Sequence, residues 1–167
     1  ETLAQLEGMA QQGTPAFTDD GRPVATAQLF RTCMECARVE DVRVIEHCAD
    51  MSLTNGGCMN EGPPAVARGL KGIPNASESA LAARDLEVLR LTGGKLHLAH
   101  ISTRETMELL RRAKEDGLNV TGEVCPHHFT LADEDIRDQD TNFKMNPPLR
   151  SRVDVEALRQ AIAAGLV

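Results

Sequence analysis

The sequence predicts an α/β fold built around a parallel sheet. One helical segment is followed by four strand–helix units in succession, and this alternation favours parallel strands joined by right-handed crossovers. The second strand segment contains Val42, Val44 and Ile45, β-branched residues that suit a buried strand. No G-x-G-x-x-G or P-loop follows any strand, which disfavours a nucleotide-binding sheet. Four units fit either an open doubly wound sheet or half of an eight-stranded barrel.

The first half of the chain contains two predicted helices and two strands. Apolar residues four apart predict one face of the second helix, and β-branched residues in "VRVIEHC" predict the second strand. In order, we expect a helix over Glu1–Gln12, a strand over Ala16–Thr18, a helix over Val24–Glu40 and a strand within 42–48. A loop rich in Gly, Pro and Asn follows, from Ala49 to about Asn75, and its length indicates a functional loop without regular structure.

The second half repeats the strand–helix pattern twice. Gly93 and Gly117 are placed to end two helices, and Ser102 with Glu105 has the S-x-x-E spacing of a capping box. In order, we expect a helix over Ser77–Leu91, a strand over Leu96–Ala99, a helix over Ser102–Asp116, a strand ending near Val124 and a last helix over Ser151–Ala164. The "FKMNPPLRS" segment must be a loop, because Pro-Pro interrupts a helix.

Composition excludes several classes of function. The chain has 167 residues, 41% of them hydrophobic and 26% charged, which is typical of a globular domain. A net charge of −7 without a basic cluster, and the absence of Trp and Tyr, argue against nucleic-acid binding. No apolar run is long enough to span a membrane. Five cysteines, an odd number, fit reduced thiols and a cytoplasmic location.

Acidic residues and histidines gather where the predicted strands end. These are Asp19 and Asp20, Glu46 and His47, His100, and Glu123 with His127 and His128 beyond it. Because parallel strands end at one edge of a sheet, these side chains are expected to lie on one face. Carboxylates and neutral imidazoles bind Zn²⁺ and similar cations, which can activate water and polarise a carbonyl. The pattern predicts a metal hydrolase, with Asp20, His47 and His100 as the leading ligands.

Each of these residues also has a structural interpretation. A lone histidine is more often hydrogen-bonded in a core, and "TDDG" is good turn chemistry. His97 lies three residues before His100, an odd spacing that predicts the opposite face of a strand and packing against a helix. His127 and His128 follow a proline in a loop, and a ligand role for them stays open.

Two further groups leave alternatives open. Cys33 and Cys36 have C-x-x-C spacing and could belong to a zinc site with later cysteines, but i, i+3 spacing within a helix is also ordinary core spacing. In "MNPPLR", Asn146 could present its amide to an amide or imide substrate, and Arg150 could pair with a carboxylate. The alternative is a rigid proline turn with a surface arginine.

The chain also resembles a known family. The segments "AFTDDGRPV", "IEHCAD", "NGGCMNEG", "GIPNASES", "LHLAHIST", "GEVCPHHFTL" and "FKMNPPLR" are similar, in order and spacing, to motifs of class I, bacterial-type dihydroorotases of the amidohydrolase superfamily. The resemblance implies part of a metal-dependent TIM (β/α)8 barrel, about strands four to seven. It also implies the reversible interconversion of N-carbamoyl-L-aspartate and L-dihydroorotate in pyrimidine synthesis, with one or two Zn²⁺ ions.

The resemblance assigns roles to individual residues. Asp20 matches a carboxylate that can bridge two zinc ions, His47 and His100 match imidazole ligands of the second zinc, and Asn146 matches a substrate contact. Hydantoinases and allantoinases are related, but they usually carry a carbamoylated lysine where this chain has the acids of "TDDG". Their proline loop generally lacks the Asn of "MNPPLR", so both points favour dihydroorotase.

Two family motifs are absent from residues 1–167. The chain lacks the H-x-H-x-R of the first strand and the D-H-x-P of the eighth strand, which carries the catalytic Asp. We therefore expect 1–167 to be a single partial catalytic domain and an internal fragment, inactive alone. The alternatives are a hydantoinase- or allantoinase-type enzyme, and a non-catalytic scaffold for aspartate transcarbamoylase. The expected partners are the small-molecule substrate, a second copy in a homodimer, and that transcarbamoylase.

Overall fold

A four-stranded parallel sheet forms the centre of the molecule. The computed structural model describes residues 2–19, 21–138 and 140–167. The strands lie in the order β1-β2-β5-β6, and every neighbouring pair is parallel. They are β1 (Ala16–Thr18), β2 (Arg43–Glu46), β5 (Lys95–Leu98) and β6 (Val120–Gly122). The predicted parallel sheet is confirmed, and the carboxyl ends of its strands share one edge.

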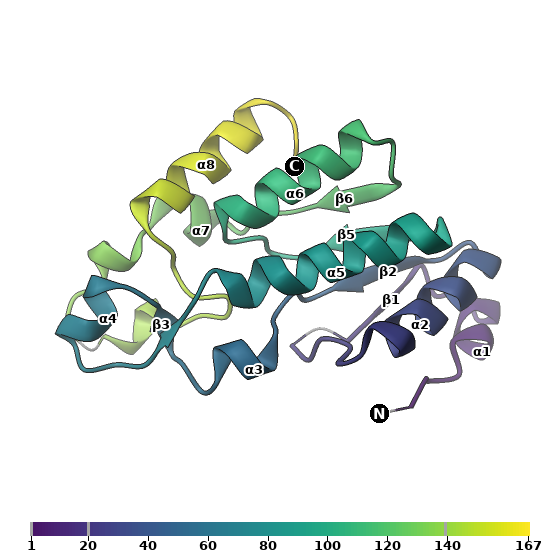
Figure 1. The fold of residues 1–167 in the computed structure, drawn as a ribbon, viewed down its shortest axis with the longest axis horizontal. Coiled ribbons are helices and arrows are strands. Elements are labelled where there is room, and N and C mark those ends of the chain that lie inside the picture. Colours follow the sequence, from purple (N-terminus) through teal and green to yellow (C-terminus); the bar gives the residue numbers. More distant parts are fainter. Residues whose placement is uncertain (1, 20, 139) are drawn as a thin grey trace.

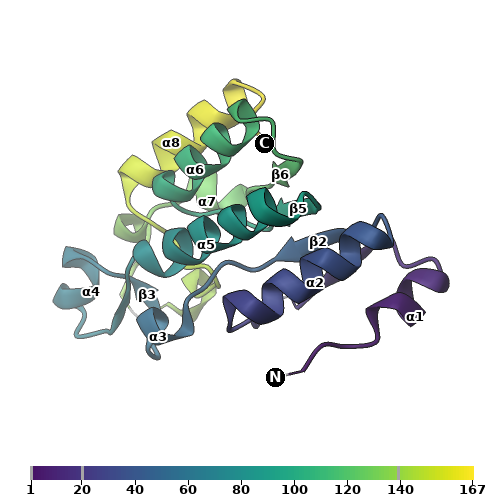
Figure 2. The same cartoon turned by 45° about the vertical axis from the view of Figure 1, so that its right-hand side comes forward.

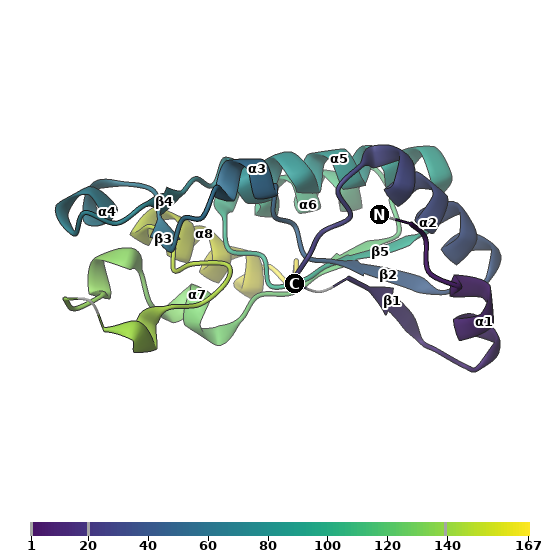
Figure 3. The same cartoon turned by 90° about the horizontal axis from the view of Figure 1, so that it is seen from below.

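The long helices cover one face of this sheet (Figures 1 and 3). They are α2 (Ala27–Val39), α5 (Ala76–Thr92) and α6 (Arg104–Glu115), while α8 (Arg152–Ala163) packs on α6 and α7, and a short α1 (Leu6–Gln11) precedes β1. Figure 2 shows α2, α5, α6 and α8 following one another in chain order, and each packs on the next. A doubly wound sheet carries helices on both faces, so this arrangement indicates a barrel segment.

The core lies between the sheet and these helices. Leu96 and Leu98 on β5 are fully buried, as are Phe30 and Met34 on α2. The strand residues between them face the other side of the sheet and are only half-buried, in the alternation that a pleated strand imposes. Cys33 is buried in the same core, which confirms core spacing for that residue.

The segment 49–75 is more regular than its composition indicates. It contains α3 (Met51–Thr54), β3 (Met59–Asn60), α4 (Pro63–Ala67) and β4 (Gly72–Ile73), with β3 and β4 forming a second parallel pair. The expectation of an unstructured loop is therefore wrong. Elements of two to five residues leave no periodic signal in a sequence, and β3 pairs with a strand that lies farther along the chain.

The predicted capping box at α6 is also wrong. The N-cap is Thr103, whose hydroxyl accepts a hydrogen bond from the Thr106 amide. The Ser102 side chain contacts the Glu78 carboxylate at very short range instead, so it is not available to the helix. Gly93 caps α5 in the left-handed conformation, and Gly117 has φ +78° just past α6, as predicted.

The remaining elements follow β6. They are α7 (Pro126–Thr130) and two 3₁₀ turns, Asp133–Asp135 and Thr141–Phe143. The proline segment that follows is irregular, as predicted, and contains a cis Asn146–Pro147 bond. Among the described residues, no helix combines the length and apolar character needed to cross a membrane.

Candidate metal and substrate site

Two predicted ligands, His47 and His100, meet at the carboxyl edge of the sheet. His47 directly follows β2 and is buried, and His100 lies two residues beyond β5 and is half-buried. Because β2 and β5 are neighbours in the sheet, their ends bring the two rings together. His47 Nδ1 lies 3.1 Å from His100 Nε2, and the ring centroids are 4.7 Å apart at 72°.

The two facing nitrogens suit a shared cation. Zinc–imidazole bonds of about 2.0–2.1 Å in a tetrahedral site place two ligand nitrogens about 3.3 Å apart. The observed 3.1 Å between His47 Nδ1 and His100 Nε2 is close to that spacing. The histidine chemistry and the geometry therefore both fit a borderline divalent metal.

Backbone conformation at His100 contributes to this arrangement. Its φ is +36°, in the left-handed region that side-chain-bearing residues rarely occupy. The backbone amide of His100 donates to Glu123 Oε1 at 3.4 Å. Unusual backbone angles concentrate at functional positions, where the surrounding structure holds them in place.

Asn146 reaches the same pair of rings from the proline loop. Its Nδ2 lies 3.2 Å from His47 Nε2. An amide can be rotated so that its oxygen accepts from Nε2–H, and the neutral His47 ring then carries its lone pair on Nδ1, the nitrogen that faces His100. The structure thus brings together three of the four predicted site residues, from β2, β5 and the loop before α8.

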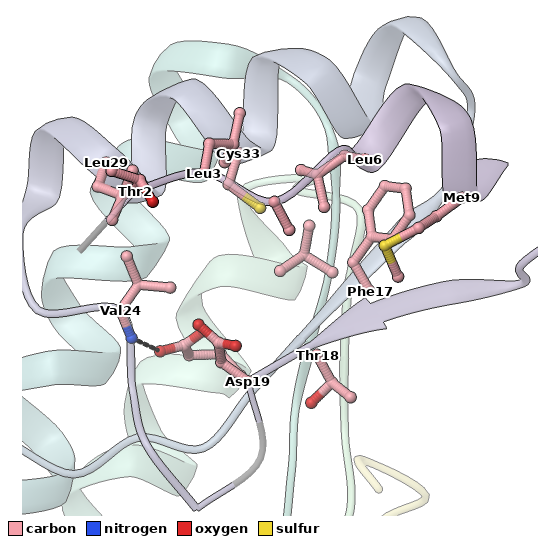
Figure 4. Close-up of a pocket in the computed structure, with 13 residues that line it drawn as sticks. Thr2, Leu3, Leu6, Met9, Phe17, Thr18, Asp19, Val24, Leu29 and Cys33 are labelled. Atoms are coloured by element: carbon pink, nitrogen blue, oxygen red, sulfur yellow. Dashed lines mark hydrogen bonds between the residues drawn. The ribbon is translucent and has the colours of Figure 1, made fainter.

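The fourth, Asp20, lies outside the described residues. Its neighbour Asp19 directly follows β1 and lines a pocket of about 140 Å³ with Glu46 and mainly apolar side chains (Figure 4).

Glu46 itself turns into the core, where it accepts a hydrogen bond from the Val24 amide at 3.1 Å. Burial, and then the charge of Asp85, raise the pKa of Glu46 to about 8. Glu46 therefore faces away from His47, although it is the adjacent residue.

His97 does not pack against a helix, so that expectation is wrong. Its Nδ1 lies 2.8 Å from Thr121 Oγ1, and its Nε2 lies 3.7 Å from Glu123 Oε2. Strand alternation sends Leu96 and Leu98 towards the helices and His97 to the opposite face. The odd-spacing argument relating His97 to His100 also does not apply, because β5 ends at Leu98.

A buried polar network behind His100 was not predicted. Glu78 on α5 accepts hydrogen bonds from the amides of Ser102 and Thr103 at 3.1 Å each, and from the Thr103 hydroxyl at 2.8 Å. These bonds fix the segment that follows His100. Glu78 and its partners are 24 and 25 residues apart, so no local pattern could have identified them.

Arg150 belongs to the same network. It is 2% exposed, and its guanidinium donates to Ser102 Oγ at 3.1 Å, Asn60 Oδ1 at 3.2 Å and the Ile73 carbonyl at 2.7 Å. It is therefore neither the surface arginine nor the free carboxylate-binding group that the sequence allowed. Instead it joins the β3–β4 pair to the loop that carries Asn146.

The remaining histidines and the cysteine pair were open questions. His128 is buried, and its Nε2 lies 2.9 Å from the Pro147 carbonyl, while His127 is half-buried. Burial is the main cause that lowers the pKa of His128 to about 4.

Across the described part of the chain, the one cluster of three or more side chains that could bind a metal includes neither Cys33 nor Cys36. Within the described residues, Cys33 and Cys36 therefore form no zinc site with the later cysteines.

Comparisons with known proteins show the family and the fold of the chain. The model of the family described as "Dihydro-orotase-like" matches residues 1–106. A dihydroorotase from Syntrophobacter fumaroxidans is 45% identical over 166 residues, which is 99% of this chain and 38% of that protein. One from Pelotomaculum thermopropionicum is 46% identical over 167 residues, which is 100% of this chain and 39% of that protein. The chain thus spans about two fifths of the length of these curated relatives.

Solved structures show the same fold. A D-hydantoinase matches with a TM-score of 0.81 at 19% identity, covering 100% of this chain and 40% of the hydantoinase. The dihydropyrimidinase from Brevibacillus agri matches with 0.82 at 18% identity, over 99% of this chain and 40% of that one. A dihydroorotase from Campylobacter jejuni matches with 0.65 at 14% identity, over 93% and 43%. The predicted partial (β/α)8 barrel is confirmed, and the chain belongs to the dihydroorotase-like family.

Proposed function

We propose that this chain is part of a zinc-dependent cyclic amide hydrolase that interconverts N-carbamoyl-L-aspartate and L-dihydroorotate in pyrimidine biosynthesis. Family membership supports the reaction class. The observation that carries the proposal is the 3.1 Å approach of His47 Nδ1 and His100 Nε2 at the carboxyl edge of the sheet. That edge is where enzymes of this fold place their chemistry.

His47 and His100 are the proposed ligands of one zinc ion, with Asp20 as a carboxylate ligand able to bridge to a second. When bound, zinc supplies Lewis-acid polarisation of a carbonyl and lowers the pKa of water towards neutrality. The two histidines hold the cation only in their neutral form, so this site loses affinity for metal as the pH falls. The buried position of His47 restricts water around that ligand.

Asn146 is the proposed substrate contact. Its amide carries two N–H donors and one acceptor oxygen, so it can hold the His47 ring and still bond to a cyclic amide or a carboxylate. The contact with His47 Nε2, at 3.2 Å, supports this placement because it sets the side chain beside the proposed metal ligands. Asn146 thus orients the substrate relative to the metal.

The rest of the active site is proposed to come from other parts of a longer protein. The two relatives quoted above are matched over only 38% and 39% of their length. Dihydroorotases carry an H-x-H-x-R motif and a catalytic Asp that residues 1–167 lack, so we propose that 1–167 is one partial catalytic domain, inactive alone. A cytoplasmic location is proposed as well, supported by the five free cysteines.

The test is the turnover of purified full-length protein with dihydroorotate, hydantoin, dihydrouracil and allantoin. We expect hydrolysis of dihydroorotate at the highest kcat/KM, and loss of most of that activity in Asn146→Ala. Faster hydrolysis of hydantoin or allantoin would overturn the substrate assignment. No turnover of any of the four would overturn the enzyme and favour a scaffold, which co-purification with aspartate transcarbamoylase would then identify.

A further inference from the structure

We propose that Cys125, His127 and His128 form a further cation site, suited to zinc or a similar borderline metal. Cys125 is the N-cap of α7, and His127 and His128 lie in the first turn of that short helix. One ligand atom from each of them lies within 4.8 Å of the other two. Neither His47 nor His100 belongs to this group, and the proposal does not depend on the hydrolase activity proposed above.

The His128 ring is already fixed in the form that binds a metal. Its Nε2 lies 2.9 Å from the Pro147 carbonyl oxygen, which can only accept, so Nε2 carries the hydrogen and donates it. Nδ1 of the neutral ring therefore holds the lone pair. Metal-binding histidines are commonly held by this kind of bond from the second nitrogen to a backbone carbonyl.

That lone pair has no partner. His128 is 2% exposed, and Nδ1 is the one buried side-chain polar atom without a hydrogen bond in the part of the chain that the structure describes. Buried polar atoms are nearly always satisfied, and an unsatisfied one costs about 1–3 kcal/mol. A cation on Nδ1 accounts for this exception, because it gives the lone pair a partner.

Two further ligands are close to His128. The His127 ring packs edge-on against it, with centroids 4.2 Å apart at 64°, and Cys125 begins the same turn. Both residues are half-buried, so a cation can reach the site from solvent. Pro126 between them restricts the backbone of the turn, so few conformations compete with the one that gathers the ligands.

The ligand set selects the type of cation. One thiolate and two imidazoles suit Zn²⁺ and Co²⁺, whereas Mg²⁺ and Ca²⁺ prefer oxygen ligands. Tetrahedral Zn–S and Zn–N bonds of about 2.3 and 2.0–2.1 Å place ligand atoms about 3.3–3.6 Å apart. Binding therefore draws the three side chains closer together than they are in the unliganded structure. It releases the thiol proton of Cys125, and one of the four coordination positions of the metal stays open.

The site has a structural consequence for the substrate loop. His128 is bonded to the carbonyl of Pro147, the residue after Asn146. A cation held by the first turn of α7 would thus fix one end of the loop that carries Asn146. We expect its removal to increase the mobility of that loop without removing the His47–His100 pair.

The test is a Co²⁺ titration of metal-free full-length protein, followed by the thiolate-to-cobalt charge-transfer absorption in the near ultraviolet. Only a cysteine-bound ion gives this band, so it separates the proposed site from the histidine pair. We expect the band in the unmodified protein and in Cys36→Ser, a matched variant of another half-buried cysteine. We expect no band in Cys125→Ser, and at least tenfold weaker Co²⁺ binding in His127→Asn.

His100→Asn separates the two sites from each other. We expect it to keep the charge-transfer band while losing Co²⁺ bound without a thiolate. The proposal is overturned if the unmodified protein shows no band, if the band survives Cys125→Ser, or if it disappears in His100→Asn. Circular dichroism confirms that each variant is folded, and His127→Asn serves in place of Cys125→Ser if the latter does not fold.

Discussion

Replacing Arg150 by Met is predicted to be strongly destabilising. The side chain is 2% exposed and donates three hydrogen bonds, to Ser102, Asn60 and the Ile73 carbonyl. Methionine fills a similar volume but donates nothing. The substitution leaves the Ile73 carbonyl and the Asn60 amide oxygen without this donor, and it removes the cation that faces the buried Glu78 carboxylate.

The magnitude follows from these contacts. Hydrogen bonds to charged groups contribute about 1.5–3 kcal/mol each, but the losses at one site are not additive. Removing one partner of a buried charge network costs about 3–5 kcal/mol, and we expect Arg150→Met to lose that much of the free energy of unfolding. Arg150→Lys keeps the positive charge but loses the planar guanidinium and its several N–H donors. We therefore expect an intermediate loss of the free energy of unfolding.

Urea unfolding of the full-length protein, followed by circular dichroism, measures this loss. Arg111→Met is the matched control, since Arg111 also has several carboxylate contacts, to Glu108 and Glu115, but lies exposed on α6. Surface ion pairs contribute little, so the control should change stability only slightly. A loss below about 1 kcal/mol in Arg150→Met would refute the reasoning from burial and unsatisfied partners.

Three further predictions concern α3, β6 and the substrate loop. Hydrogen bonds in the first turn of α3, chiefly from the Ser52 hydroxyl, lower the pKa of Asp50 below its ordinary 3.8. The unfolded chain thus takes up this proton first as the pH falls, so Asp50 stabilises the protein above pH 3.8 and this contribution is lost in stronger acid. Asp50→Asn should reduce that acid dependence in unfolding measured at pH 7 and pH 3. Gly122→Ala places a Cβ 2.7 Å from a Leu110 methyl carbon, and calorimetry should show a loss of about 1–3 kcal/mol. Asn146→Ala should lower kcat/KM for dihydroorotate by a larger factor than it lowers the zinc content, and an unchanged kcat/KM would contradict its role as a substrate contact.

Strand periodicity predicted the parts of the fold that carry the site. Four short strands alternating with helices predicted a parallel sheet, and β1, β2, β5 and β6 form one. Placing His47 and His100 at two strand ends was enough to predict that they meet, because neighbouring parallel strands end at one edge. The position of Asn146 beside them came from the family resemblance and not from any local pattern.

Long-range contacts account for what the sequence did not reveal. Ser102 has the spacing of a helix cap, yet its hydroxyl is held by Glu78, which is 24 residues away. Glu46 and His47 are adjacent, but the end of β2 sends one side chain into the core and the other to the site. The pairing of β3 with β4 and the hydrogen bonds of Arg150 likewise depend on residues that are far apart in the sequence, so local patterns do not reveal them.

The metal content of histidine variants tests the central claim most directly. Full-length protein, His47→Asn, His100→Asn and His97→Asn would be purified identically, and the zinc bound per chain measured by elemental analysis beside dihydroorotate turnover. We predict that His47→Asn and His100→Asn each lose bound zinc and most activity, while His97→Asn keeps its zinc. Full zinc content and normal turnover in His100→Asn would contradict the assignment of the His47–His100 pair as a metal site.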